Sequence, residues 1–406
     1  MNVNAQILVA GGGLAGRAAA LRFAASGARV ALADPDAATD DTPPPRADGR
    51  PAGRDLRTTA VLQPSIATLS RAGAWGRIAP LAEPLWTMRL VDAGGRVRTP
   101  RETADFEARS LMDRPFGYNV PNAAAREAMA ARIAEEPRIT RIAAAVTDLV
   151  TRSTEVQARL GDGSVVRARL LVAADGRESA VRRLAGIGIR RWSYAQRALV
   201  FCVSHPEPHR GISTEIHRTG GPCTLVPMPD LEDRPASSVV WMMPAARARA
   251  LETLDDAALG AALTAETMGL MGPLRVEGPR AAWPIIGQIA TRLRANRVAI
   301  AAEAAHVIPP IGAQGLNMSL ADVECLARLV EDGGHGDPGS EALLSAYERR
   351  RLPEVAARVA GVDLLNRFAE TEWQPLRDLR YAGLAAIHRI GPLRRAAMRF
   401  GLGAGV

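Results

Sequence analysis

The stretch from residue 5 to residue 34 constrains the fold of this chain more than any other. An apolar segment at 5–10 runs directly into the turn GGGLAG at 11–16, which opens an alanine- and leucine-rich segment. A second apolar segment at 29–33 then ends at Asp34. The pattern predicts a strand, a tight turn, a helix and a second strand closed by an acidic residue, which is the order typical of a dinucleotide-binding unit.

Each part of this unit has a physical role. Gly11, Gly13 and Gly16 permit the turn and let backbone N–H groups approach a pyrophosphate, whose charge the helix N-terminus favours. Asp34 can accept hydrogen bonds from a ribose hydroxyl. The alternative is a βαβ unit without a ligand. The pattern occurs once in the chain, so we predict one resident dinucleotide and a second nucleotide that binds only transiently.

A second glycine-rich turn lies far along the chain, in RVAIAAEAAHVIPPIGAQGLNMSLADV at 297–323. Pro309 and Pro310 fix φ and stiffen the approach. Gly312 and Gly315 let backbone lie close to a flat ring, and we expect a helix to begin near 316–317 with its free N–H groups facing that ring. The alternative is a turn that serves packing alone.

Composition excludes several classes of function. The 406 residues are 47% hydrophobic and 23% charged, as in a soluble protein of two or more domains. The net charge is +8 and every basic residue is arginine, but the arginines are scattered among acids, so we predict no nucleic-acid partner. Three widely spaced cysteines indicate neither a disulfide framework nor a zinc site, and no metal is expected.

The chain starts almost directly on an apolar segment and shows no evident secretory signal. No uncharged apolar run approaches the ~20 residues that span a bilayer. We therefore expect a cytoplasmic protein that at most rests on the inner membrane surface. The tail at 381–402, YAGLAAIHRIGPLRRAAMRFGL, together with Arg380, mixes an apolar face with arginines, which is typical either of a helix lying on an anionic membrane or of an ordinary packed helix with solvated arginines.

Between the two turns the pattern changes twice. Residues 55–57 lead into a predicted helix that runs to Leu69. Three alternating stretches from 142 to 173 predict an antiparallel meander, which ends at DGRES, 175–179, before a short helix. Four strands with Pro/Gly loops and one helix follow, and this change of character predicts a second, sheet-based domain. Those strands are expected at 197–204, 212–217, 223–227 and 238–243, and the helix near 255–268.

Three landmarks in this order, GGGLAG at 11–16, DGRES at 175–179 and AEAAHVIPPIGAQGLN at 302–317, resemble the class A FAD-dependent aromatic hydroxylases with the p-hydroxybenzoate hydroxylase fold. The chain is most similar to the ubiquinone-biosynthesis hydroxylase group, also at 55–75, 116–123 and 387–402. The resemblance implies an α/β fold: a Rossmann-type FAD-binding domain with an inserted, mostly antiparallel β-sheet substrate domain and a helical C-terminal tail. The expected segments are 1–186 and 285–345 for the FAD-binding domain, 187–284 for the substrate domain and 346–406 for the tail.

The resemblance also implies an activity, namely hydroxylation of a polyprenylated phenol ring in ubiquinone biosynthesis. Such enzymes use FAD, NAD(P)H and O2 through a C4a-hydroperoxyflavin. The implied partners are a lipophilic phenol, O2, the membrane surface and a quinone-biosynthesis complex. Two alternatives stay open: a hydroxylase of a soluble aromatic compound, and a non-catalytic flavoprotein of a quinone-synthesis complex.

By resemblance, Gly11, Gly13, Gly16 and Asp34 would bind the ADP half of FAD, and Asp175 and Glu303 would face the pyrophosphate and ribityl chain. The other implied cofactor-binding residues are Arg57, Arg126, Gly312, Gln314, Gly315, Leu316 and Asn317. No residue is assigned as a catalytic base, because the flavin carries the chemistry. His306 is expected to be a hydrogen-bonded structural histidine, and Trp283 to line the active-site wall.

The chain departs from the family pattern at both ends of the last landmark. Ala302-Glu303 stands where the family usually has Gly-Asp, and Gly312-Ala313 where it usually has Ala-Gly. Glutamate keeps the charge of aspartate but is one methylene longer. Ala313 must adopt a negative φ or be strained, where glycine would be free.

Overall fold

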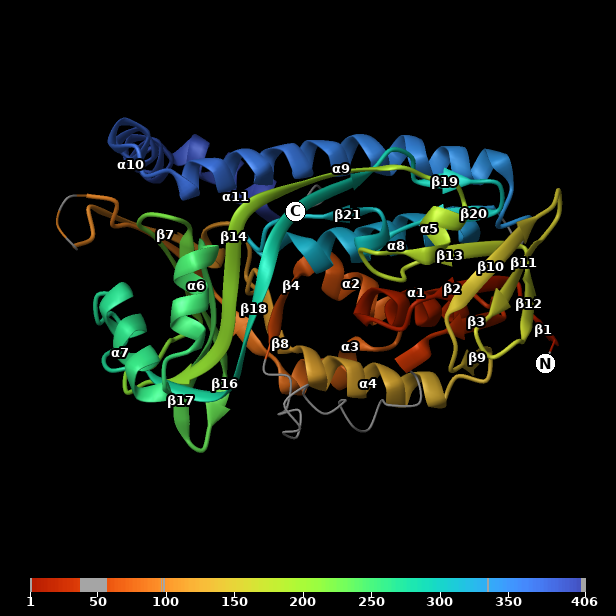
Figure 1. Ribbon diagram of the computed structural model, residues 1–406, viewed down its shortest axis with the longest axis horizontal. Helices are drawn as coiled ribbons and strands as arrows, with labels where there is room; N and C mark the ends of the chain where they lie inside the picture. Colours follow the sequence, from red (N-terminus) through yellow and green to blue (C-terminus); the bar gives the residue numbers. More distant parts are fainter. Residues whose placement is uncertain (1, 37–56, 96, 98, 334–335, 403–406) are drawn as a thin grey trace.

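The computed structural model describes residues 2–36, 57–95, 97, 99–333 and 336–402 (Figure 1). Its elements form one mostly parallel sheet, one large mixed sheet, two small sheets and a helical C-terminal region. The predicted α/β class, with an inserted sheet domain and a helical tail, is confirmed.

The mostly parallel sheet has the order β19-β20-β13-β2-β3-β9. Its central strands are buried along their whole length, because helices and a second sheet cover them. Helix α1 packs between α4 and α8 and shares the core with this sheet. The strands are β19 Arg294–Ala295, β20 Val298–Ile300, β13 Leu170–Ala173, β2 Ile7–Ala10, β3 Val30–Ala33 and β9 Ile139–Ile142; the helices are α1 Leu14–Ala25, α4 Asn122–Ala134 and α8 Gln314–Asp332.

The predicted antiparallel meander is present as β10 (Val146–Thr151), β11 (Val156–Leu160) and β12 (Val165–Ala168), with β1 (Asn2–Asn4) added in parallel beside β12. Its third stretch was predicted as one strand, and this is wrong. The chain divides at Arg169, and the four residues that follow form β13 between β2 and β20. All four residues are apolar and fully buried, so they pair within the buried parallel sheet and not within the meander.

The large sheet has the order β21-β18-β14-β17-β16-β15-β6-β7 and is antiparallel except for the pairing of β15 with β6. It includes β6 and β7, which come from residues 87–107, so it extends beyond the segment 187–284 expected for the substrate domain. One face packs against α6 and α7. The bounds are β21 His306–Val307, β18 Arg275–Ala290, β14 Ile189–Ser204, β17 Arg234–Pro244, β16 Pro222–Leu231, β15 Ile212–His217, β6 Thr87–Asp92, β7 Glu102–Glu107, α6 Ala245–Glu252 and α7 Asp256–Glu266.

A small sheet, β4-β8-β5, lies between these two parts. The prediction of one helix from 55–57 to Leu69 is wrong in its first half: Thr58–Leu62 is strand β4, whose β-branched residues pair with β8, and the helix α2 begins only at Gln63, with Pro64 in its first turn. The remaining elements are β8 Gly117–Pro121, β5 Glu83–Leu85, α2 Gln63–Arg71, α3 Trp75–Ile78, α5 Ala180–Leu184 and the 3-10 turns η2 Ala79–Leu81, η3 Ala108–Ser110 and η4 Ala302–Ala304.

Three helices end the chain: α9 (Glu341–Glu370), α10 (Gln374–Arg389) and α11 (Gly391–Leu402). Helix α9 runs along the top edge of the molecule in Figure 1, with α10 at its left end. Within the part of the chain that the structure describes, no helix is long and apolar enough to cross a membrane.

Candidate active site

The first observation about the site is topological. Strands β20, β13, β2 and β3 are neighbours in the parallel sheet, and each is followed at its carboxyl end by a residue predicted to bind the cofactor. Glu303, Asp175, the turn 11–16 and Asp34 therefore lie in that order along one edge of the sheet. This edge is where ligands bind in open α/β sheets.

The glycines of the first turn serve two purposes. Gly11 has φ 101°, and a Cβ on it would lie 2.3 Å from the carbonyl oxygen of Ala174. A Cβ on Gly16 would lie 1.9 Å from the carbonyl oxygen of Gly11. These two glycines are needed to close the turn. A Cβ on Gly13 would meet nothing within 4 Å, so the space in front of the N-terminus of α1 is open.

Asp34 is buried at the end of β3, and its carboxylate lies beside the backbone of Gly12. The sequence analysis did not identify the arginine that lies beside this carboxylate. Arg17, also buried, donates from Nε to the carbonyl oxygen of Gly12 at 2.6 Å, and one of its terminal nitrogens lies 3.8 Å from the Asp34 carboxylate. The sequence did contain a signal for this contact, because Arg17 stands in the alanine-rich helix just after the turn. The same side chain donates to the backbone carbonyl of Arg126 on α4, so that predicted residue comes close to the first turn.

Asp175 and Glu303 lie on neighbouring turns. The Asp175 carboxylate accepts hydrogen bonds from Ser179 Oγ at 2.5 Å and from the backbone N–H of Val181 at 3.0 Å, and so it fixes the start of α5. Glu303 is half exposed, and its carboxylate lies 3.4 Å from Nε of Arg177. The ion pair joins the segment 175–179 to the turn η4.

The second glycine turn leads into α8, which begins at Gln314, slightly earlier than predicted. Gly312 and Ala313 both have left-handed backbone, with φ 64° and 55°. Ala313 therefore takes the strained conformation, which costs about 1–2 kcal/mol for a residue with a Cβ. A Cβ on Gly315 would meet nothing within 4 Å, so the backbone there faces open space.

Asn317 holds this helix end against the small sheet. Its amide nitrogen donates to the carbonyl oxygen of Ala60 at 2.8 Å, and its amide oxygen accepts from the N–H of Leu62 at 2.9 Å. Gln314 is held by Arg358 of α9, which donates to its side-chain oxygen at 2.7 Å. Both predicted residues therefore fix the position of the turn through contacts that its sequence alone did not reveal.

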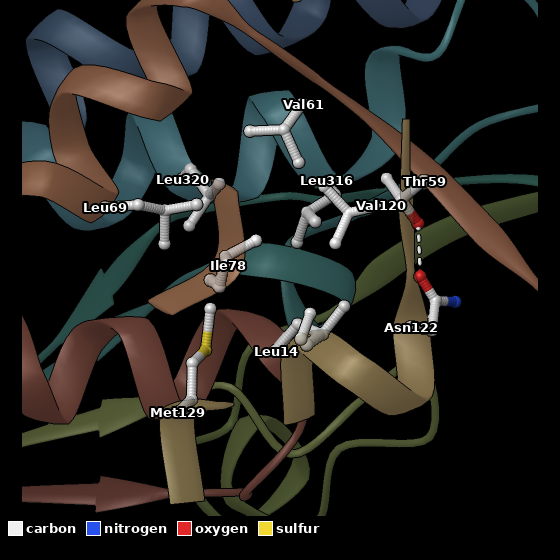
Figure 2. A pocket seen from close by; sticks show the side chains of 11 residues that line it. Leu14, Thr59, Val61, Leu69, Ile78, Val120, Asn122, Met129, Leu316 and Leu320 are labelled. Atoms are coloured by element: carbon white, nitrogen blue, oxygen red, sulfur yellow. Dashed lines mark hydrogen bonds between the residues drawn. The ribbon is translucent and has the colours of Figure 1, made fainter. Parts of the chain in front are cut away.

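The two helix N-termini converge. Leu14, the first residue of α1, and Leu316, in the first turn of α8, line the same narrow cavity of about 10 Å³ (Figure 2). Thr59 of β4 and Asn122 of α4 close one side of it, joined by a hydrogen bond of 2.8 Å between Thr59 Oγ1 and Asn122 Oδ1. Two turns that are 300 residues apart thus belong to one site.

A buried charge cluster supports the second half of the site. The Asp322 carboxylate, on α8, lies 2.7 Å from Nε2 of His306, accepts from Nε of Arg351 at 2.9 Å and accepts from the backbone N–H of Ala302 at 3.0 Å. His306 is thus a buried, hydrogen-bonded histidine. Burial opposes ionisation of Asp322, but His306 and Arg351 outweigh it and hold the pKa of this carboxyl below its ordinary value. The cluster pins Ala302, which has the left-handed φ of 56°, at the start of η4.

The large sheet faces the second turn with an apolar surface. Tyr194, Ala198, Met242 and Ile285 pack in one cluster with Ile311, which precedes Gly312. On β18, Trp283 is 42% exposed. The guanidinium carbon of Arg57 lies 5.0 Å from the centroid of the Trp283 ring, so the structure brings this predicted arginine to the sheet.

These features fit FAD. The row of strand ends gives an extended edge, and the N-termini of α1 and α8 offer N–H donors to anionic groups, with open space in front of Gly13 and Gly315. Within the described residues, no group of three or more His, Cys, Asp or Glu side chains could hold a metal ion.

Comparison with known proteins agrees with this geometry. The FAD binding domain family matches residues 4–361. The chain is 35% identical to the protein named ubiquinone hydroxylase UbiL of Rhodospirillum rubrum, over 98% of this chain and 90% of that protein. It is 29% identical to 3-demethoxyubiquinol 3-hydroxylase of Escherichia coli K12, over 99% of each.

Solved structures share the fold. The p-nitrophenol 4-monooxygenase PnpA of Pseudomonas putida superposes with a TM-score of 0.75 at 18% identity, over the whole of both chains. PqsL of Pseudomonas aeruginosa, described as a probable FAD-dependent monooxygenase, gives a TM-score of 0.74 at 22% identity, over 94% of this chain and 99% of that one. The chain therefore belongs to the FAD binding domain family, as an FAD-dependent oxidoreductase with the fold of the class A monooxygenases.

Proposed function

We propose that this protein hydroxylates the aromatic ring of a polyprenylated phenol in ubiquinone biosynthesis, with FAD as its cofactor and NAD(P)H and O2 as co-substrates. The observation that carries the proposal is the near full-length similarity to UbiL, together with the edge of the parallel sheet, where β20, β13, β2 and β3 are each followed by a residue predicted to bind the cofactor. The E. coli relative, matched over 99% of both chains, supports the same class of ring substrate.

The chain's own residues bind and orient the cofactor. The N-terminus of α1 receives the pyrophosphate in the open space at Gly13, and Asp34 accepts from a ribose hydroxyl. The N-terminus of α8 presents N–H donors and positive dipole charge where a reduced flavin ring carries negative charge. FAD, when bound, supplies the hydride and oxygen chemistry.

The remaining residues shape the space around the substrate ring. The cluster of Tyr194, Ala198, Met242, Ile285 and Ile311 provides an apolar wall between the large sheet and the second turn. Because this cluster is buried and packed, it keeps water away from the second turn on the side of the large sheet. Asn317 and Gln314 keep the second turn in place beneath it, through β4 and α9.

The test is NAD(P)H oxidation by the purified, FAD-loaded chain, with and without a detergent-solubilised polyprenylphenol, followed by mass spectrometry of the product. We expect substrate-stimulated oxidation and a product with one more oxygen atom. Stimulation by small polar phenols alone would instead indicate a soluble aromatic substrate. FAD binding with no stimulation by any phenol would indicate a non-catalytic flavoprotein of a quinone-synthesis complex.

A second measurement asks the same question in the cell. We expect deletion of the gene to remove ubiquinone and to accumulate a polyprenylphenol that lacks one oxygen. An unchanged quinone profile in a strain with no second hydroxylase gene of this kind would contradict the proposal.

A further inference from the structure

The C-terminal helices carry an unusual share of the exposed apolar side chains. Across the described residues, twelve large hydrophobic side chains are exposed, and six of them lie within residues 364–393. Exposed apolar residues are normally scattered, and a contiguous group marks an interaction surface. We call this group the outer apolar face; it consists of Leu364, Leu365, Trp373, Leu379, Ile390 and Leu393.

Helix α10 shows how this face arises. Its inner side is packed: Leu384 and Ile387 lie against the cluster that contains Phe106 of β7 and Phe116. Its outer side carries Leu379 with the small exposed residues Ala382 and Gly383, at helical spacing. The helix is therefore apolar on two sides, and only the inner side has a partner within the described chain.

Ion pairs anchor α10 to the large sheet. Arg380 donates to the buried Asp92 of β6 at 2.9 Å, and Arg101 donates to both Asp92 and Asp378. The inner side of the helix is thus fixed by packing and charge, so its outer side is presented in a defined orientation.

The charge around the part of this face on α10 and α11 is mainly positive, whereas the part between Leu364 and Trp373 lies beside the acidic residues Asp363, Glu370 and Glu372. From Gln374 to Leu402 the chain has six arginines and a single acidic residue, Asp378, which pairs with Arg101. Arg389, whose side chain is 69% exposed, lies next to Ile390 and pairs with Glu102 at 3.3 Å, and Arg395 and Arg399 are exposed on α11. Apolar side chains with an arginine rim match an anionic bilayer surface, which takes the apolar groups at the headgroup boundary and neutralises the arginines.

The same helices reach the flavin end of the site. The carbonyl oxygen of Gly401, on α11, accepts a hydrogen bond of 2.9 Å from the side chain of Gln314, the first residue of α8. Met398 is buried with Leu62, the end of the strand that Asn317 holds. One element thus covers the flank of the second glycine turn on its inner side and exposes apolar and basic groups on its outer side.

We propose that the outer apolar face and its arginine rim form the surface by which this protein docks on an anionic lipid bilayer. Docking there places the helices that flank the second turn between the membrane and the site. The proposal deepens the proposed function, because a polyprenylated substrate resides in the bilayer. It is tested separately, by vesicle binding without substrate.

The experiment is flotation of the full-length, FAD-loaded protein with phosphatidylcholine vesicles, with and without phosphatidylglycerol. We expect binding to the anionic vesicles that weakens as salt is added. The triple variant Leu379→Ser, Ile390→Ser, Leu393→Ser should lose binding by at least about ten-fold, since each side chain would otherwise leave water. Its control, Leu81→Ser, Val150→Ser, Leu270→Ser, changes three similarly exposed residues elsewhere and should bind as the parent does.

A second pair of variants tests the charge. Arg389→Gln with Arg395→Gln should weaken binding to anionic vesicles, and Arg138→Gln with Arg152→Gln, exposed arginines of the other end of the molecule, should leave it unchanged. No flotation of the parent protein, or equal loss in test and control triples, would overturn the proposal. So would a dimer that the test triple converts to a monomer without changing flotation, because the face would then join two copies. Hydroxylation of solubilised substrate without vesicle binding would leave the proposed function in place and remove only this surface.

Discussion

At the first glycine-rich turn, Gly11 and Gly16 lie against backbone carbonyl groups, whereas at the second turn the glycines face open space. A Cβ would lie 2.3 Å from a carbonyl oxygen at Gly11 and 1.9 Å from one at Gly16, but 3.9 Å from the nearest atom at Gly312, and nothing is near Gly315. The first turn is therefore closed by steric contact that only glycine allows.

The second turn is held by side chains that lie outside it. Asn317 ties it to β4, Arg358 ties Gln314 to α9, and the buried Asp322 joins His306, Arg351 and the backbone of η4. One half of the site is thus specified by its own short motif, and the other by a polar network spread over the last third of the chain. Substitutions in the two halves should have different signatures.

The largest effect is expected for Asp322→Asn. The change leaves His306 beside a neutral side chain and leaves Arg351 to pair with the partly exposed Glu354, and removal of one member of a buried ion pair costs about 3–5 kcal/mol. Urea unfolding of the apoprotein measures it. Arg77→Gln, at the exposed Arg77–Glu135 pair, serves as the control and should cost about 0–1 kcal/mol. A loss below about 1 kcal/mol at Asp322 would mean that the second half is not held by this charge.

The same carboxylate sets an acid limit. Its folded pKa is lower than its ordinary value of 3.8, so its contribution to stability is complete above that value and is lost as the pH falls through the folded pKa. We expect the difference in unfolding free energy between the parent and Asp322→Asn to be constant from neutral pH down to about pH 5 and to shrink only in stronger acid. A difference that already shrinks near neutral pH would contradict the assignment of this stabilisation to the Asp322 carboxylate.

Gly16→Ala should come next in size. Its Cβ would collide with a backbone oxygen, which cannot rotate away, so we expect a loss of about 3 kcal/mol in the unfolding free energy of the apoprotein. Thermal unfolding without FAD measures it. Gly27→Ala is the comparison variant. A Cβ on Gly27 would meet nothing within 4 Å, but the residue has φ 88°, so this variant measures the cost of backbone strain without a collision. Equal losses at the two positions would contradict the steric account of the first turn.

Gly13→Ala and Gly315→Ala should act on the cofactor alone. Neither Cβ meets a protein atom within 4 Å, so the apoprotein should keep its stability to within about 0.5 kcal/mol. Both occupy space in front of a helix N-terminus, and we expect FAD affinity to fall about ten-fold, or 1.4 kcal/mol. Titration of flavin fluorescence measures the affinity. An unchanged affinity at Gly315 would place the ring away from the second turn.

The smallest effect is expected for Ala313→Gly, and it should stabilise. Glycine accepts the left-handed backbone without strain, although it also gains entropy when unfolded, so we expect a net gain of about 1 kcal/mol. Ala195 has nearly the same φ, 54°, and Ala195→Gly is the matched control. Both variants should gain stability, and only the change at 313 should alter FAD affinity. A loss of stability at 313 would show that the strain is relieved by neighbouring contacts.

Most of the fold could be predicted from short-range patterns in the sequence. The first turn, the meander and the four strands of the large sheet follow from periodicity and glycine placement, because those signals are local. The division at Arg169 could not be predicted, since Leu170–Ala173 become a separate strand only when Val298–Ile300 and Ile7–Ala10 pair on either side. Strand β4 was missed for the same reason, because its partner β8 lies more than fifty residues away.

The candidate site divides in the same way. Its glycines and the acid at the end of β3 were visible because each has a conformational or chemical reason that a motif records. The roles of Arg17 and Asp322 were not visible, because both depend on tertiary partners such as the backbone of Gly12 and the side chains of His306 and Arg351. The amide of Asn317 was predicted to lie along the ring, and the structure shows it also binding β4. The prediction that it contacts the cofactor stays a prediction.

The order of strands in the parallel sheet has a consequence for synthesis. β2 and β3 emerge from the ribosome first, but β13 comes between β2 and β20, which is encoded much later, and the second turn follows β20. The hydrogen bond from Gln314 to Gly401 waits for the last helix. A nascent chain can thus form the first turn early, but the pocket between the two turns is complete only after α8 has been translated. We therefore expect FAD to bind only after the second turn has been synthesised, and then to stabilise the folded chain in which both turns are assembled.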